Sequence, residues 1–125
     1  MKKILIIDDE RDICLLIKQN LELSGDYRVI IAHNGKDGIS AARHEKPDLI
    51  LLDIIMPGVS GFDVLKKLKE LEDTCSIPVV MLTAIGTEEA KEKAMSLYNE
   101  DYLVKPVRTD VLRAKIEEVL KRGKF

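Results

Sequence analysis

Three aspartates and one lysine stand where they could hold a metal ion and a phosphoryl group. Asp8 and Asp9 follow one apolar run, Asp53 ends a second, and Lys105 follows a third. If these runs converge, the three carboxylates repel one another, and one is protonated at neutral pH unless a cation joins them. The donors are all oxygens, with no His or Cys close by in the sequence. The pattern therefore favours a hard cation, Mg²⁺ or Mn²⁺.

The carboxylate of Asp53 is the candidate nucleophile. A carboxylate can attack phosphorus and form an acyl phosphate, and a metal ion neutralises charge on the transferring group. Lys105 can contact a phosphoryl oxygen as a point charge, and the hydroxyl of Thr83, which ends another apolar run, can donate to a further oxygen. An acyl phosphate on Asp53 is the chemistry that these residues fit best.

The apolar runs that carry these residues are predicted strands. The run 49–52 is wholly aliphatic, and such a run without polar alternation is typical of a central parallel strand buried on both faces. Strands are expected at five places: 3–7, 27–32, 49–52, 77–82 and 101–104.

Amphipathic stretches follow each of these runs and predict five helices. Asn34 is the expected N-cap of the second helix and Thr87 that of the fourth. The first helix is expected to bury four apolar residues on one face: Ile13, Leu16, Ile17 and Leu21. The same spacing allows Cys14 on this face as well, without requiring it.

Regular alternation of strands and helices predicts one doubly wound α/β domain over residues 1–125, with right-handed crossovers and a parallel sheet. The strand that begins at Tyr27 mixes polar and apolar residues, which suggests an edge and hence the strand order 2-1-3-4-5. Ligands of such sheets bind at the carboxyl ends of the strands, where the order reverses. That crevice would collect Asp8, Asp9 and Asp53.

Composition excludes several classes of function. Charged residues make up 34% of the chain with a net charge of −2, which provides no bulk attraction to nucleic acid. The longest apolar runs are only long enough for strands, so neither a membrane span nor a signal peptide is expected. The two cysteines form no CxxC motif, which favours thiols in a reducing cytoplasm. His33 and His44 are expected at the surface, away from the metal site.

Taken together, the motifs resemble the receiver domain of two-component response regulators, over essentially the whole chain. Any one of them is weak, but all appear in the right order. The motifs are Asp8-Asp9, the segment 49–57 whose strand ends in Asp53, Thr83-Ala84, and the segment 101–106, which ends in Lys105-Pro106.

This resemblance implies a flavodoxin-like fold and a signalling switch rather than a dedicated turnover enzyme. Asp53 would accept a phosphoryl group from a histidine kinase or a phosphotransfer protein. Asp9 and Asp53 would hold Mg²⁺ directly, the backbone carbonyl of Ile55 would complete the protein ligands, and Asp8 would act largely through water.

The resemblance also implies a switch pair, Thr83 and Tyr102, and a cis bond between Lys105 and Pro106. The signal would leave through the face built by the fourth helix, the fifth strand and the fifth helix, toward a downstream protein. We expect a cytoplasmic monomer or phosphorylation-dependent dimer that has no output domain in this chain and binds neither nucleic acid nor membrane.

Two local features bear on this switch. Receivers commonly carry Gly-Ala before the acidic pair that opens the last strand, whereas Tyr98-Asn99 stand here, which leaves the shape of the output surface open. Ile55 and Ile85, two residues beyond Asp53 and Thr83, should flank the site and hinder an attacking water. We expect a comparatively persistent phosphorylated state.

Three other functions fit the sequence less well than the switch. A phosphohydrolase with Asp53 as nucleophile usually has a second acid two residues later, where this chain has Ile55. A receiver-like module that works without phosphate fits poorly with the complete set of acids and Lys105. A flavin or dinucleotide module would need a Gly-rich or Ser/Thr-rich first loop in place of acids.

Overall fold

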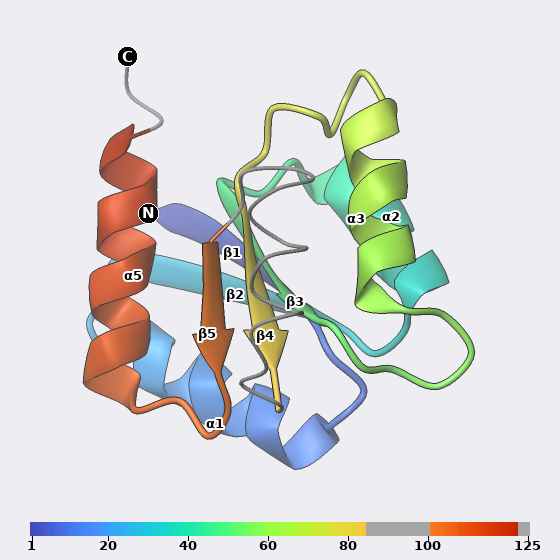
Figure 1. The fold of residues 1–125 in the computed structure, drawn as a ribbon. Coiled ribbons are helices and arrows are strands. Elements are labelled where there is room, and N and C mark those ends of the chain that lie inside the picture. Colours follow the sequence, from blue (N-terminus) through green and yellow to red (C-terminus); the bar gives the residue numbers. More distant parts are fainter. Residues whose placement is uncertain (85–100, 123–125) are drawn as a thin grey trace.

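The computed structural model describes residues 1–84 and 101–122 of the chain. Its five strands are β1 (Lys2–Ile7), β2 (Tyr27–Ala32), β3 (Leu49–Asp53), β4 (Val79–Thr83) and β5 (Asp101–Val104). They form one parallel sheet in the order β2-β1-β3-β4-β5 (Figure 1). The predicted α/β class and strand order are confirmed.

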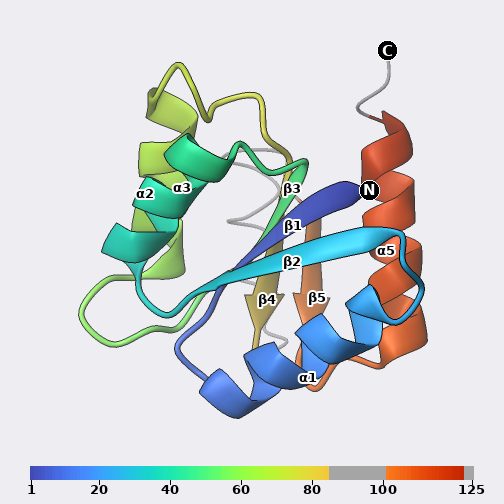
Figure 2. The same ribbon diagram turned by 180° about the vertical axis from the view of Figure 1, so that it is seen from behind.

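The described helices are α1 (Arg11–Glu22), α2 (Gly35–Glu45), α3 (Gly61–Glu70) and α5 (Thr109–Arg122). The predicted fourth helix with its cap Thr87, the residue Ile85 and the turn at Tyr98-Asn99 lie outside the described residues. In both ribbon views α1 and α5 cover one face of the sheet, and α2 and α3 cover the other (Figures 1 and 2). Within the described ranges, every helix is too short or too polar to cross a bilayer.

The core has two halves because neighbouring residues of a strand face opposite sides of the sheet. Leu5, Ile7 and Leu52 pack with α2 and α3, while Ile4, Ile6 and Leu51 pack with α1 and α5. All six side chains are fully buried, and each contributes about 1.5–3 kcal/mol by leaving water. Burial on both faces explains why these strands are continuously apolar.

The buried stripe of α1 differs from the prediction. Cys14 and Leu21 are fully buried and Ile17 packs against the same cluster, whereas Leu16 is 60% exposed. Several consecutive apolar residues at the start of this helix allow more than one stripe. The expectation that Leu16 packs inward was wrong.

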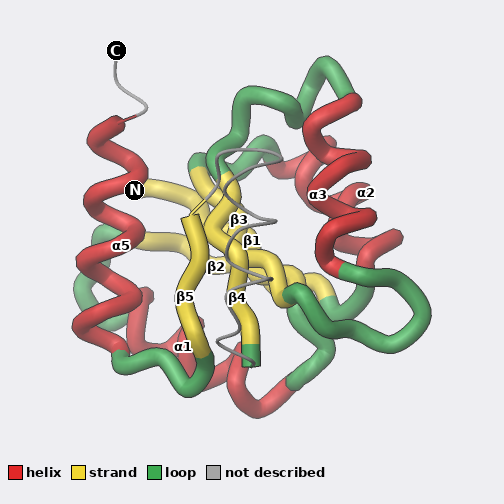
Figure 3. The backbone as a smooth tube through the Cα atoms, viewed as in Figure 1, coloured by secondary structure: helices red, strands yellow, loops and turns green. Residues whose placement is uncertain are grey.

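Local interactions hold α2 against the end of β1. The Asn34 side chain accepts a hydrogen bond from the backbone N–H of Asp37 at 2.8 Å, which confirms the predicted N-cap. A Cβ atom added at Gly38 would lie 2.6 Å from Cδ1 of Ile7. Only glycine permits this approach, so α2 packs closely against Ile7. Figure 3 shows α2 and α3 together on one side of the sheet.

The loop after β3 closes tightly on Asp53. The backbone N–H of Gly61 donates to the carbonyl of Ile54 at 2.7 Å. A Cβ atom added at Gly61 would lie 2.2 Å from the carbonyl oxygen of Asp53. The start of α3 is therefore held against the end of β3, and this contact fixes the backbone that carries Asp53.

Candidate functional site

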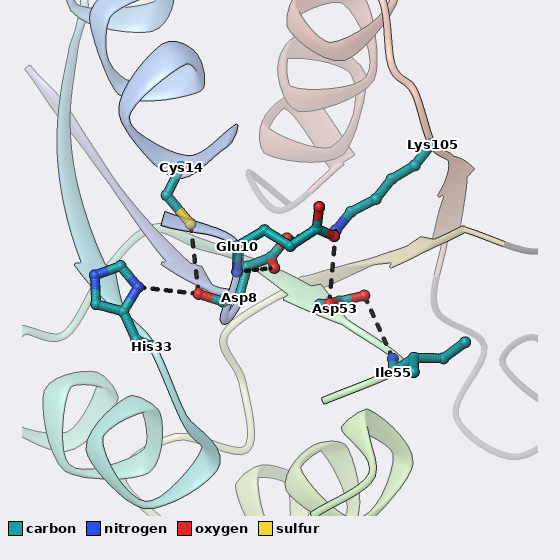
Figure 4. A network of polar contacts seen from close by, with 7 residues as sticks. All are labelled: Asp8, Glu10, Cys14, His33, Asp53, Ile55 and Lys105. Atoms are coloured by element: carbon teal, nitrogen blue, oxygen red, sulfur yellow. Dashed lines mark hydrogen bonds and ion pairs between the residues drawn. The ribbon is translucent and has the colours of Figure 1, made fainter. Parts of the chain in front are cut away.

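Three of the predicted site residues meet at the carboxyl ends of their strands (Figure 4). Asp8 follows β1, Asp53 ends β3, and Lys105 follows β5. The Nζ atom of Lys105 lies 2.6 Å from Oδ2 of Asp8 and 3.6 Å from Oδ2 of Asp53. Asp8 is fully buried and Asp53 is 2% exposed, so their charges depend on this ammonium and on any added cation.

Glu10 joins the cluster, although the sequence did not lead us to predict it. Its Oε1 lies 2.8 Å from Nζ of Lys105, and its backbone N–H donates to Oδ1 of Asp8 at 3.0 Å. Carboxylate oxygens of Asp8, Glu10 and Asp53 all lie within 4.8 Å of one another. In the sequence, only the position of Glu10 directly after Asp8-Asp9 indicated that it could belong to the site.

Asp9 lies differently from its neighbours. It is half-buried, and the acid group that forms within the described ranges consists of Asp8, Glu10 and Asp53. Its assignment as a direct metal ligand stays a prediction.

Burial raises the pKa of Asp53 from 3.8 to about 7, and the negative charge of Asp8 acts in the same direction. The Lys105 ammonium and the hydrogen bond from the backbone N–H of Ile55, at 3.3 Å, lower it and offset part of this effect. The positive charge beside Asp53 is therefore too small to stabilise its ionised form fully. A divalent cation or a proton would relieve this shortage.

Burial alone would lower the pKa of Lys105, but its hydrogen bonds to Asp8 and Glu10 outweigh burial, and the charges of Asp53 and Asp8 add to them. The net pKa is raised above the ordinary lysine value. Lys105 is therefore a fixed positive charge at neutral pH. The peptide bond that joins it to Pro106 is cis, as predicted.

The other predicted residues lie around this cluster. Thr83 ends β4, where its backbone pairs with Val104. Tyr102 is half-buried, pairs with Met81 across the sheet and packs against the core on the side of α2 and α3. The side chain of Ile55 is 54% exposed beside Asp53. The switch role of Thr83 and Tyr102 stays a prediction.

Two side chains converge on the backbone carbonyl of Asp8 (Figure 4). Nδ1 of His33 lies 3.1 Å from this oxygen, and Sγ of Cys14 lies 3.5 Å from it. His33 is half-buried, so the expectation that it stands at the surface away from the site was wrong. The position of His33 directly after β2 brings it to the same end of the sheet as Asp8.

An apolar groove opens beside Lys105, between α1 and the segment that joins β5 to α5. Its volume is about 390 Å³. Glu10 and Lys105 stand at the rim that it shares with the acid cluster. The apolar part of its lining consists of Ile13, Leu16, Ile17, Leu82, Ala84, Pro106, Val107 and Leu112.

Comparison with known proteins decides the family. Residues 4–117 match the family model of the response regulator receiver domain. The chain belongs to the receiver domain family of response regulators. Members of this family are signalling switches of two-component systems rather than dedicated enzymes, and they work with histidine kinases and downstream effectors.

Curated relatives of this receiver domain are longer proteins. It is 39% identical over 124 residues to the alkaline phosphatase synthesis transcriptional regulatory protein PhoP of Bacillus subtilis, covering 99% of this chain and 50% of that protein. It is 40% identical over 123 residues to the transcriptional regulatory protein CpxR of Escherichia coli K12, covering 98% and 51%. The chain thus spans about half the length of these relatives, and the expected lack of nucleic-acid binding stays a prediction.

Solved structures show the same receiver fold. A two-component response regulator from Clostridium difficile superposes with a TM-score of 0.90 at 32% identity, with 100% of both chains covered. A CheY-like receiver domain protein from Methanospirillum hungatei gives 0.89 at 31% identity, covering 99% of this chain and 97% of that one.

Proposed function

We propose that residues 1–125 form one receiver domain that accepts a phosphoryl group on Asp53 and converts it into a change of surface. The observation that carries this proposal is the ammonium of Lys105, which lies between buried Asp8, exposed Glu10 and Asp53. A nucleophilic carboxylate needs positive charge beside the phosphoryl oxygens. We place this domain in the cytoplasm, as a monomer or a phosphorylation-dependent dimer.

The donor set fits Mg²⁺, with Mn²⁺ as the alternative. Three carboxylates within 4.8 Å of one another face a single ammonium, so the cluster lacks positive charge. Asp9 and Asp53 would hold the ion with the carbonyl of Ile55, and Asp8 would act through water. The ion would supply charge neutralisation for the incoming phosphoryl group.

We propose that Lys105 exchanges a partner during phosphoryl transfer. Its Nζ already donates to Asp8 and Glu10, and it lies 3.6 Å from Asp53. Asp8 is fully buried, whereas the Glu10 side chain is 47% exposed. Water can solvate a released Glu10 carboxylate at little cost, but not that of Asp8. Glu10 is therefore the partner that Lys105 gives up when it contacts the phosphoryl group.

The phosphodonor is a histidine kinase or a histidine phosphotransfer protein, and the apolar groove beside Lys105 is its docking surface. The groove shares Glu10 and Lys105 with the acid cluster, and Leu16 presents an exposed aliphatic side chain to it. A helix docked on this groove would place a phosphohistidine close to Asp53. Apolar contact gives affinity, and the adjacent acids and lysine orient the transfer.

The output would leave through the surface of β5 and α5 together with the predicted fourth helix. Val104 and Val111 are 39% and 45% exposed on the described part of this surface. Thr83 would donate to the phosphoryl group, and Tyr102 would turn inward as Thr83 moves. The phosphate can shift this equilibrium only through contacts that differ between the two states.

The test is incubation of the chain with Mg²⁺ and acetyl phosphate, followed by intact mass measurement. The wild-type chain should gain one phosphoryl group, and Asp53→Asn should gain none. Asp63→Asn is a suitable control, because this acid lies in the first turn of α3 and should leave labelling unchanged. Equal labelling of Asp53→Asn would contradict the assignment, and steady turnover of the phosphodonor would favour the hydrolase alternative.

A further inference from the structure

The main chain of Asp8 is held from three sides. Its N–H donates to the carbonyl of Ala32 at 3.0 Å. Its carbonyl oxygen has two side-chain partners, Nδ1 of His33 at 3.1 Å and Sγ of Cys14 at 3.5 Å. The two side chains come from different elements, His33 from the end of β2 and Cys14 from α1.

The chemistry of these contacts sets the direction of each hydrogen bond. A carbonyl oxygen can only accept, so His33 must carry its proton on Nδ1. Cys14 is fully buried, and a protonated thiol is a weak donor. His33 is therefore the stronger of the two partners.

The carbonyl of Asp8 and the N–H of Asp9 belong to one rigid peptide unit. Its orientation determines where the Asp8 side chain begins and in which direction Asp9 leaves the strand. Asp8 must present Oδ1 to the N–H of Glu10 and Oδ2 to Lys105 at the same time. A rotation of this peptide would move both acids and disturb both contacts.

We propose that His33 is a positioning residue for the acid cluster. By donating from Nδ1 to the Asp8 carbonyl, it holds the Asp8-Asp9 peptide in the orientation that divalent-cation binding requires. This inference rests on the proposed function, because it assumes that the acids bind Mg²⁺.

Three variants and the wild-type chain test the proposal by Mg²⁺ titration, followed by NMR chemical shifts. His33→Ala should weaken Mg²⁺ binding about three- to tenfold, as expected for one lost hydrogen bond. His33→Asn should restore affinity to within about twofold of wild type, because its amide nitrogen can take the place of Nδ1. His44→Ala is the matched control, since Nδ1 of His44 lies 2.9 Å from the exposed carbonyl of Ser40.

A second measurement, on the metal-free wild-type chain, reads the tautomer of His33 from its ring nitrogen shifts. A neutral ring whose single proton is on Nε2 would overturn the proposal whatever the titrations give, because Nδ1 could then not donate. Unchanged Mg²⁺ affinity in His33→Ala, or no recovery in His33→Asn, would overturn it while leaving the proposed function in place. A wild-type chain that binds no Mg²⁺ would instead overturn the metal site of the proposed function, and the positioning role with it.

Discussion

Replacing Asp53 by Asn should stabilise the metal-free protein, by an amount that grows with pH. Burial raises the pKa of Asp53 from 3.8 to about 7 in the folded chain. In the unfolded chain the carboxyl is solvated and ionises near its ordinary value. Because asparagine carries no charge at any pH, the substitution removes the cost of an ionised carboxylate beside Asp8.

The sign of the effect comes from proton linkage. Between pH 4 and pH 7 the folded wild-type chain binds a proton at Asp53 that the unfolded chain has released. The contribution of the Asp53 carboxyl to the free energy of unfolding is therefore fully present below its pKa in the unfolded chain. It is lost as the pH rises through its pKa in the folded chain. The raised pKa of about 7 corresponds to a total loss on the order of 4 kcal/mol by pH 8.

The assay is urea unfolding of wild type and Asp53→Asn in EDTA at several pH values from 4 to 8. Taking the difference between the two proteins removes the titration of groups that they share. The stability of Asp53→Asn relative to wild type should rise by about 2–4 kcal/mol across this range. Saturating Mg²⁺ should reduce the rise, because a cation stabilises the ionised form.

Asp73→Asn is the matched control, because this carboxylate is 40% exposed at the surface and pairs with Arg43. Its relative stability should change little between pH 4 and pH 8. A difference between wild type and Asp53→Asn that stays flat over this range would refute the argument that burial and Asp8 penalise the charge on Asp53.

Other substitutions test separate parts of the site. Gly61→Ala should lower the free energy of unfolding by roughly 3 kcal/mol, since its Cβ would lie 2.2 Å from a backbone oxygen of β3; a loss below about 1 kcal/mol in urea unfolding would contradict this close approach. Glu10→Gln should speed labelling by acetyl phosphate about two- to fivefold by removing a charged competitor for Lys105, and slower labelling would identify Glu10 as a needed ligand. Thr83→Ala should keep phosphorylation and weaken binding of a downstream partner, so loss of labelling would count against its switch role. Ile55→Asn should change the rate of phosphate loss, and decay at the wild-type rate would show that this side chain does not limit water.

The sheet could be predicted from the sequence because its strands are buried on both faces. The continuous apolar residues of β1, β3 and β4 identify central strands, and the mixed β2 identifies an edge. The acids and Lys105 could be placed because parallel strands end at one edge of the sheet. These inferences needed only the positions of residues along strands.

The remaining details depend on directions that residue types do not encode. Glu10 directly follows the aspartate pair, but its turn toward Lys105 depends on the hydrogen bond from its N–H to Asp8. His33 is distant from Asp8 in the chain and approaches it only through the pairing of β1 with β2. Leu16 is one of several neighbouring apolar residues in α1, so spacing alone could not decide which of them stays exposed.

The order of residues at the end of β5 has a consequence for how a signal could travel. Val104, with its exposed side chain, is followed immediately by Lys105, whose ammonium lies among the acids. A single peptide bond thus joins an exposed residue of β5, Val104, to a residue of the acid cluster, Lys105. A double-mutant cycle between these neighbours, read out as partner affinity, would measure the energetic coupling between their side chains.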